Sequence, residues 1–395
     1  MKIGIDLRAL AAGKHTGVEE YVVGLLQTLF LIDTENEYVL FFNAWGNIEP
    51  DFSWVPKSPR ITWKRFRVPN KLLNLSLWYF HYPKLDHLLG GVDLFFMPNL
   101  NFAAFSKNVR VFVTAHDLSF ELFPEAFSWK QRVWHYLVNF RGLLGRADAV
   151  IAVSHSTALD LRDRYHVPLE KIHTILSGIS KRFVPLSRND PKLLDVQKRY
   201  HLPYRFILSL GTFEPRKNLG ALISAFEVLQ ATAVGELLKY ELVLAGAPGW
   251  KCEDLLERIA RSPAREKIHL VGFVKEEDKP ALYALATVFV YPSLYEGFGF
   301  PPLEALATGV PVIASHSASL PEIIGEAGVL IDPYRPDELL IALREVLGNR
   351  ELQDTLKQAA LVQCQKFSWS HSAEELRQQF SRNEKGFHEL HEVFL

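Results

Sequence analysis

The segment Glu296–Ala305 (EGFGFPPLEA) has the residue types and spacing of an anion-binding turn. An apolar run of strand length ends at Tyr291, and we expect a helix near Pro302, because proline suits the first helical turn. Gly297 and Gly299 have no side chain, so a ligand can approach the backbone closely. The unbonded amides and the dipole at a helix start attract anions, and a diphosphate would fit there.

Glu296 and Glu304 belong to this turn, but repulsion between like charges keeps them from facing the diphosphate themselves. They are better suited to accept hydrogen bonds from hydroxyl groups. We expect Glu296 to hold a sugar and Glu304 to hold a ribose. An ordinary strand-to-helix turn with a carboxylate in the first helical turn would give the same pattern.

A second loop, Gly211–Asn218 (GTFEPRKN), occupies the same structural place, between a strand expected at 206–210 and a helix expected at 218–229. Its adjacent cations, Arg216 and Lys217, can neutralise a diphosphate leaving group. In a partly dry cleft they would stabilise charge that develops only in the transition state. A solvated pair of surface cations is the alternative.

His116 follows an apolar strand expected at 110–114. A histidine at the carboxyl end of a parallel strand lies where ligands bind in open α/β sheets. It could bind a sugar hydroxyl or orient an incoming acceptor. The alternative is a core histidine bonded to Asp117 or to the backbone.

The loop Gly13–Val18 follows the first strand, and its glycines could let backbone amides, among them those of Gly17 and Val18, meet phosphates from the opposite side of the cleft. The loop lacks a full G-x-G-x-x-G pattern, so it does not support a dinucleotide site. A nicotinamide-dependent enzyme is therefore disfavoured.

Apolar runs of strand length alternate with helical patterns, which predicts parallel sheets covered by helices on both faces. The pattern restarts near residue 206, after a joint at 177–203 that is rich in Pro, Arg, Asp and Ser. We therefore expect an α/β fold of two doubly wound Rossmann-like domains that face each other across a ligand-binding cleft. The predicted strands are 2–6, 38–42, 92–97, 110–114, 149–153, 206–210, 241–245, 268–270, 288–291 and 312–314. The predicted helices are 18–30, 128–144, 218–229, 278–286, 302–308 and 337–347, and Ser154 is placed to cap a further one.

The composition excludes several classes of protein. The 395 residues favour two domains, and a net charge of -1 gives no support for binding nucleic acid. No apolar run approaches the ~18 residues of a membrane span, and the N-terminus does not resemble a signal peptide. Cys252 and Cys364 are too few for a disulfide framework or a metal cluster, which predicts a reducing, cytoplasmic setting.

Residues 52–85 contain no acid and carry seven lysines or arginines interleaved with aromatic residues. This composition suits peripheral contact with anionic lipid at the inner face of a membrane, or with a lipid-linked diphosphate acceptor. The alternative is a sheet edge whose Lys and Arg side chains lie over buried rings.

Together these motifs resemble one family, the retaining glycosyltransferases of the GT-B fold, and within it the family-four group of bacterial mannosyl-, glucosyl- and related transferases. The resemblance extends over nearly the whole chain. It implies an acceptor-binding domain at 1–182, a nucleotide-sugar-binding domain at 183–366, and a C-terminal helix at 367–395 that crosses back to the first domain. The matching segments are Gly4–Arg8 with Thr16–Gly17, His116–Asp117, Gly211–Asn218, Val271–Val274, Glu296 with Glu304, and Phe367–Trp369.

The resemblance also implies roles for individual residues. The catalytic residues would be His116, Arg216, Lys217 and Glu296, the last of which would contact hydroxyls of the donor sugar. The donor-binding residues would be Gly17, Val18, Gly211, Thr212, Phe273, Val274, Gly297, Phe298, Gly299 and Glu304. This chain departs from many members at Gly211, where they have arginine, at Ser177–Ser180, where they have NGID, and at Gly17–Tyr21, where they have GIGRY.

The implied reaction moves a hexose from a nucleotide sugar to a glycan or lipid-linked acceptor in cell-surface polysaccharide synthesis, with retention at the anomeric carbon. Resemblance to O-antigen and capsule mannosyltransferases points to GDP-mannose, and a UDP-sugar is the alternative donor. No carboxylate is clearly placed as a nucleophile, which favours a front-face path. No DxD-like pair is presented for a metal, and Arg216 and Lys217 could replace one, so we expect no metal or other cofactor.

Two other functions fit parts of the pattern. One is a catalytically silent subunit that binds a nucleotide sugar for a partner, although the presence of Glu296, Glu304, Lys217 and His116 disfavours it. The other is an epimerase that acts on a sugar nucleotide, but the acid and base carboxylates that it would need are not evident.

Overall fold

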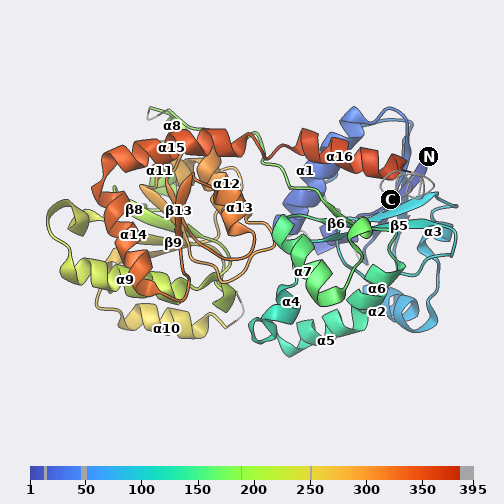
Figure 1. Ribbon diagram of the computed structural model, residues 1–395, viewed down its shortest axis with the longest axis horizontal. Coiled ribbons are helices and arrows are strands. Elements are labelled where there is room, and N and C mark those ends of the chain that lie inside the picture. The colour runs from blue at the N-terminus through green and yellow to red at the C-terminus, as the bar shows by residue number, and fades with distance from the viewer. Residues whose placement is uncertain (13–15, 46–50, 188, 250, 383–395) are drawn as a thin grey trace, which may run out of the picture.

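The computed structural model describes residues 1–12, 16–45, 51–187, 189–249 and 251–382. Two parallel β-sheets form the two halves of the molecule (Figure 1), and each sheet has an apolar core on both faces. The predicted α/β class is therefore confirmed. Residues 13–15 of the Gly13–Val18 loop and residues 383–395 of the predicted C-terminal segment lie outside the described residues.

The first half contains a seven-stranded parallel sheet in the order β3-β2-β1-β4-β5-β6-β7. The strands are β1 (Lys2–Asp6), β2 (Glu37–Asn43), β3 (Ile61–Phe66), β4 (Leu94–Met97), β5 (Arg110–Ala115), β6 (Ala149–Ala152) and β7 (Ile172–Thr174). The helices are α1 (Gly17–Ile32), α2 (Asn70–Leu75), α3 (Leu85–Leu88), α4 (Ser119–Leu122), α5 (Trp129–Val138), α6 (Phe140–Arg146) and α7 (His155–Tyr165). The central strands are apolar throughout because both of their faces are buried.

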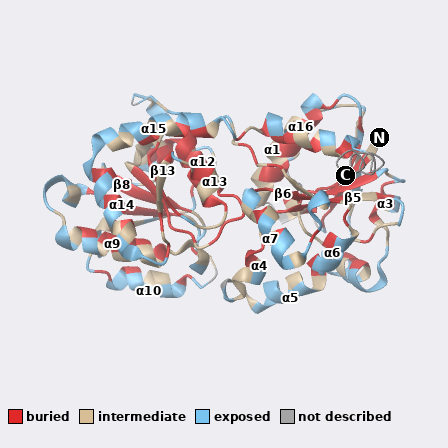
Figure 2. Ribbon diagram, in the orientation of Figure 1, coloured by how far each residue is buried: buried red, intermediate tan, exposed pale blue. Residues whose placement is uncertain are grey.

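The second half contains a six-stranded parallel sheet in the order β10-β9-β8-β11-β12-β13. The strands are β8 (Phe206–Leu210), β9 (Glu241–Ala245), β10 (Ile268–Gly272), β11 (Val288–Tyr291), β12 (Val312–Ser315) and β13 (Gly328–Ile331). The helices are α8 (Pro191–Arg199), α9 (Leu219–Thr232), α10 (Glu253–Arg261), α11 (Lys279–Leu285), α12 (Phe300–Ala307), α13 (Leu320–Ile324), α14 (Pro336–Gly348) and α15 (Arg350–Cys364). Figure 2 shows the buried residues concentrated along the strands of both halves.

The last described helix, α16 (Trp369–Ser381), packs against α1 of the first half, although it follows the second half in the chain (Figure 1). Its apolar face, which includes Leu376 and Phe380, belongs to the core of the first sheet. The Arg110 guanidinium at the start of β5 donates to the carbonyl oxygen of Phe380 at 2.9 Å. The first domain is thus built from two segments that are far apart in the sequence.

Several predicted elements are confirmed and one is wrong. The strands predicted at 2–6, 206–210, 241–245 and 288–291 begin and end at those residues, and the Ser154 side chain caps α7. The single helix predicted at 128–144 is instead two helices, α5 and α6. Asn139 separates them because its backbone is left-handed, with φ 53°, and its side chain caps α6.

Candidate active site

The candidate site lies where β8 and β11 end, because these two strands are neighbours in the second sheet and point the same way. The loop after β8 contains Arg216 and Lys217 in a short 3-10 turn, η5 (Pro215–Lys217). The loop after β11 contains Glu296. Parallel strands bring their carboxyl ends to one edge, so residues almost eighty positions apart meet there.

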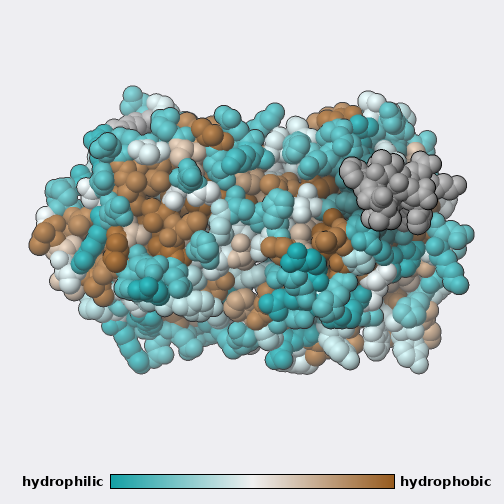
Figure 3. Space-filling view, viewed as in Figure 1, coloured by the Kyte–Doolittle hydropathy of each residue, from teal (hydrophilic) through white to brown (hydrophobic). Residues whose placement is uncertain are grey.

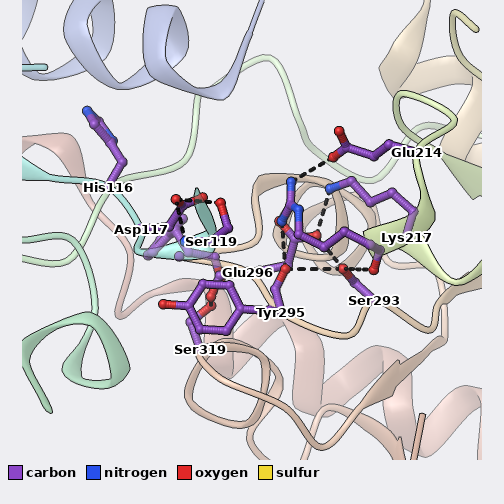
Figure 4. A network of polar contacts seen from close by, with 12 residues as sticks. His116, Asp117, Ser119, Glu214, Lys217, Ser293, Tyr295, Glu296 and Ser319 are labelled. Atoms are coloured by element: carbon purple, nitrogen blue, oxygen red, sulfur yellow. Dashed lines mark hydrogen bonds and ion pairs between the residues drawn. The ribbon is translucent and has the colours of Figure 1, made fainter. Parts of the chain in front are cut away.

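Glu296 is the centre of a buried polar network (Figure 4), and its side chain is enclosed, with 8% of the residue exposed. One carboxylate oxygen, Oε1, accepts hydrogen bonds from the Lys217 ammonium at 2.6 Å, from the Ser293 hydroxyl at 2.6 Å and from the Tyr291 hydroxyl at 3.0 Å. Sequence analysis assigned Glu296 and Lys217 to the site separately. The structure brings them into direct contact.

The Arg216 guanidinium bridges the second carboxylate oxygen and two further groups. Its Nη1 atom lies 3.0 Å from Oε2 of Glu296 and donates to the carbonyl oxygen of Tyr295 at 2.6 Å. Its Nη2 atom donates to Glu214 at 2.8 Å. Two cations are therefore balanced by two carboxylates, and both oxygens of Glu296 are engaged.

The loops that hold these side chains are bonded to each other. The backbone amide of Leu294 donates to the carbonyl oxygen of Arg216 at 2.8 Å, and the Ser293 hydroxyl oxygen lies 3.1 Å from the same carbonyl oxygen. The Ser319 hydroxyl, at the start of α13, donates to the carbonyl oxygen of Glu296 at 2.9 Å. This framework fixes the backbone on both sides of the ion pairs, which favours a preorganised site.

The charges in this network shift the pKa of each group. Burial alone would raise the pKa of Glu296, but the neighbouring Arg216 and Lys217 lower it to about 2. Burial lowers the pKa of Lys217, and the Glu296 carboxylate opposes that effect. Burial would also lower the pKa of Arg216, but Glu296 and Glu214 raise it. At neutral pH the network therefore holds an ionised carboxylate against cationic side chains.

This network predicts a stability change at acid pH. Because folding lowers the pKa of Glu296, its ionised form stabilises the folded state above pH ~4.5, and that contribution is lost as the pH falls toward 2. At pH 6 we expect the free energy of unfolding of Glu296→Gln to be about 3 kcal/mol lower than that of the wild type. Calorimetric unfolding from pH 6 to pH 3 should show this difference shrink by about 2 kcal/mol. A difference that stays constant with pH would contradict the ion pairs.

The first domain touches this network at Gly297. A β-carbon at Gly297 would lie 1.8 Å from the carbonyl oxygen of His116 and 2.7 Å from the β-carbon of Asp117, so only glycine fits. The Thr157 hydroxyl donates to the carbonyl oxygen of Gly297 at 3.3 Å. The described conformation therefore depends on close approach of the two domains at this glycine.

His116 lies apart from the ion pairs in Figure 4, on the side of the first domain. Its Nε2 atom lies 2.8 Å from the carbonyl oxygen of Pro98, and its ring meets the Tyr21 ring edge-on at 4.8 Å. Asp117 accepts bonds from Ser119. Desolvation lowers the pKa of His116, which favours the neutral imidazole at pH 7. The imidazole is therefore suited to hydrogen-bond a hydroxyl rather than to serve as a cation.

Glu304 lies in α12, and its hydrogen-bond partner lies in α11. It is buried and accepts a hydrogen bond from the Tyr283 hydroxyl at 2.8 Å. Burial raises the pKa of Glu304. The two predicted glutamates therefore have different partners, cations for Glu296 and a tyrosine hydroxyl for Glu304.

The remaining predicted residues lie on several elements of the two domains. Gly17 begins α1, and a β-carbon there would lie 3.3 Å from the Phe300 ring of α12, so Gly17 lies against the second domain, while Val18 packs against the core of the first sheet. Gly211 and Thr212 line a small cavity with Lys217. Phe298 is buried, and Gly299 caps α12 with a left-handed φ of 113°. Phe273 is exposed and Val274 buried just after β10, two strands away from β8.

Sequence analysis missed several residues that complete the site. Tyr291 and Ser293 both bond to Glu296. They could have been predicted from the sequence, because they are polar residues just before Glu296. Tyr295 donates to Asp160 of the first domain at 2.7 Å, and no pattern in the sequence links that pair. Within the described ranges, no group of three or more His, Cys, Asp or Glu side chains is arranged to hold a metal ion.

Two family models match the two halves of the chain. The model described as "Glycosyltransferase Family 4" matches residues 16–182, and "Glycosyl transferases group 1" matches residues 195–362. An "O-antigen chain mannosyltransferase B" of Escherichia coli is 34% identical over 261 residues, which cover 66% of this chain and 67% of that protein. The chain belongs to the family 4 glycosyltransferases.

Two further comparisons concern this glycosyltransferase. A "Serotype-specific mannosyltransferase WbdA" of Escherichia coli is 33% identical over 273 residues, which are 68% of this chain but 33% of that longer protein. The solved structure of sucrose-phosphate synthase from Thermosynechococcus elongatus superposes with a TM-score of 0.72 at 21% identity, and the match covers 96% of this chain and 98% of that one. The expected GT-B fold of the glycosyltransferase is thus confirmed.

Proposed function

We propose that this glycosyltransferase moves a hexose from a nucleotide-sugar donor to a glycan or lipid-linked acceptor, with retention and without a metal ion. The observation that carries the proposal is the buried network of Arg216, Lys217 and Glu296 opposite the backbone of His116. It combines cations for a leaving diphosphate with a carboxylate for sugar hydroxyls, at the edge where two domains meet.

The two cations would act on the leaving group. Their charge is balanced by Glu296 and Glu214. The arginine could donate two hydrogen bonds to a donor diphosphate beside it, and the lysine would attract the diphosphate as a point charge. Charge that develops as the glycosidic bond breaks would then meet fixed cations in a site shielded from water. This supports metal-independent transfer, because the cations can supply the charge that a metal would supply.

Retention requires either two inversions or departure and attack on one face. We propose the second route, through an oxocarbenium-like state in which the leaving diphosphate takes the acceptor proton. Both oxygens of Glu296 are engaged by cations, and Asp117 is engaged by Ser119, which disfavours either carboxylate as a nucleophile. Trapping of a covalent glycosyl-enzyme would overturn this route.

The proposed donor is GDP-mannose and the proposed role is the synthesis of a cell-surface polysaccharide, because the two relatives described above are mannosyltransferases by name and one is an O-antigen enzyme. We place the protein in the cytoplasm, since its cysteines, Cys252 and Cys364, are free. We also propose peripheral contact with the membrane through residues 52–85. No described helix is long and apolar enough to cross a membrane.

A panel of nucleotides and nucleotide sugars, each tested with EDTA present, examines this function. We expect GDP to raise the unfolding temperature, GDP-mannose to be slowly hydrolysed, and EDTA to change neither result. NMR of the hydrolysis reaction should show that the sugar is first released as the α-anomer, the anomer present in the donor.

Each part of the proposal can fail separately in this panel. Stabilisation by UDP alone would overturn the choice of donor. Activity that EDTA removes and a divalent ion restores would overturn metal independence, and a β-anomer would overturn retention. Binding without any hydrolysis or transfer would favour the silent-subunit alternative.

A further inference from the structure

The first domain contains an apolar cavity of about 310 Å³ that none of the predicted active-site residues lines. It lies between the ends of β2 and β3 and the segment formed by α2 and a one-turn π-helix, η2 (Ser76–Phe80). The residues that line it are Phe41, Asn43, Phe66, Val68, Leu72, Leu73, Ser76, Pro83 and Leu88. Its volume is at the lower end of the ~300–1,000 Å³ typical of small-molecule sites.

The polar side chains of this cavity already have partners. The Asn43 amide donates to the carbonyl oxygen of Val68 at 3.0 Å and to Asn70 at 2.7 Å, and it accepts from the backbone amide of Val68 at 3.0 Å. The Ser76 hydroxyl donates to the carbonyl oxygen of Tyr82 at 2.5 Å. A polar ligand would find few unpaired groups there, so the cavity suits a hydrocarbon.

Large apolar side chains stand exposed around the cavity. Tyr79 and Phe80 are each 67% exposed, and the neighbouring side chains Leu72, Leu75, Trp78 and Tyr82 are also exposed. By contrast, Leu73 and Leu77 on the same segment are buried and anchor it to the domain. Aromatic rings of this kind are typical of surfaces that sit at the interface between lipid and water.

The charge around the segment is complementary to an anionic lipid. Residues 52–85 contain no acid, and the basic residues nearest the α2–η2 segment in sequence are Arg67, Lys71 and Lys84. Asp86, the next acid along the chain, is buried and accepts from the backbone amide of Ser106 at 2.9 Å. Basic residues next to exposed rings favour a membrane that carries negative headgroups.

The first part of the 52–85 stretch does not take part in this surface. Phe52, Trp54 and Trp63 pack against the core of the first sheet, and the Arg65 guanidinium lies over the Trp63 ring at 4.8 Å. That arrangement is the sheet edge given above as the alternative for these residues. The exposed rings are confined to the second part, residues 72–82.

A second apolar patch, over the second domain around α14, provides a contrast (Figure 3). Ile341 of α14 is 60% exposed there. However, α14 carries Arg344 as well as Asp337, Glu338 and Glu345, and Arg335 pairs with the first two acids, so charges of both signs are mixed with its apolar side chains. Of the two patches, the one around α2 therefore lies in a stretch with basic residues and no acid, which attracts an anionic membrane.

We infer that the α2–η2 segment inserts its exposed rings into an anionic membrane and that the cavity beneath it takes one acyl chain of a phospholipid. This inference rests on the proposed membrane contact and adds to it a binding site for a hydrocarbon chain. The occupant is a membrane phospholipid rather than the nucleotide-sugar donor, because no charged side chain lines this cavity and Arg216, Lys217 and Glu296 are not among its lining residues.

The test uses vesicles of phosphatidylcholine, with and without phosphatidylglycerol, and the whole protein. Flotation should show binding only to the anionic vesicles. The triple variant Trp78→Ser, Tyr79→Ser, Phe80→Ser should lower that binding by about tenfold or more, because it removes the inserted apolar area. The matched control, Tyr204→Ser, Ile341→Ser, Val362→Ser, changes three other exposed large apolar residues outside the 52–85 stretch and should bind as wild type does.

The cavity itself is tested with phosphatidylglycerol that carries a photoreactive diazirine at the end of an acyl chain. Crosslinks should map to the lining residues between 66 and 88, and Val68→Trp, which fills the cavity from its rim, should reduce them severalfold while flotation persists. Crosslinks elsewhere, or equal crosslinks in Val68→Trp, would overturn the acyl-chain site. Failure to bind anionic vesicles would overturn the whole inference.

A donor-induced thermal shift is measured on every variant in parallel. The donor is proposed to bind the second domain, so an intact shift with no lipid binding rejects the membrane surface and leaves the proposed reaction untouched. Lipid binding and cavity crosslinks that persist without any donor shift would reject the proposed reaction and uphold the lipid site.

Discussion

Replacing Lys217 with methionine is expected to slow the release of nucleoside diphosphate from the donor by about 10²–10³-fold. Methionine keeps much of the apolar stem but removes the charge that lies 2.6 Å from Glu296. If the lysine stabilises charge on the departing diphosphate, the loss falls on kcat and leaves the KM for the donor nearly unchanged. Initial rates over a range of donor concentrations separate the two constants.

A matched control for this variant is Lys239→Met, which removes an exposed lysine paired with Glu236 in the same domain. Exposed ion pairs contribute little to stability, so the control should turn over donor within about twofold of the wild-type rate. A Lys217→Met enzyme with unchanged kcat and a raised KM would mean that the lysine binds the ground state and the transition state equally. That result would contradict its role on the leaving group.

Gly297→Ala is expected to lower donor turnover by about 10²-fold while the second domain still binds nucleotide. The added β-carbon would lie 1.8 Å from the carbonyl oxygen of His116, and a backbone atom cannot give way as a flexible side chain can. The two domains would be held apart, and the catalytic groups would be misaligned. Turnover is compared with the thermal shift that the nucleotide produces on the same variant.

The control for Gly297→Ala is Gly348→Ala at the end of α14, where a β-carbon would meet no atom within 4 Å. It should keep both turnover and thermal shift. Full turnover by Gly297→Ala would show that the contact with His116 is not needed for catalysis. Loss of the thermal shift as well would show that the substitution damages the donor domain rather than domain approach.

The elements that sequence predicted best are those buried on both faces. The strands at 206–210 and 288–291 read as continuous apolar runs because helices cover both sides of the sheet. The edge strand β3 was missed as a strand, since its residues are exposed or only partly buried and the adjacent Lys64 and Arg65 interrupt any apolar run. The break at Asn139 was missed because a left-handed residue within a helical pattern leaves no mark on its periodicity.

The candidate site was predictable as a set of residues but not as an arrangement. Sequence motifs named Arg216, Lys217 and Glu296 one at a time. Their contact follows from β11 pairing with β8 rather than with β10, and that strand order is not written in any local pattern. The hydrogen bond from Tyr295 to Asp160 depends on how the two domains meet, and local sequence gives even less information about that than about strand order.

The return of α16 to the first domain affects how the chain can fold as it is made. A ribosome releases the chain from its N-terminus, and domains generally fold as they emerge. The apolar face of α1, including Leu25 and Leu26, must wait for Leu376 and Phe380, which emerge only after the whole second domain. The second domain is thus complete in one stretch and can fold first, whereas the first domain emerges first and is finished last.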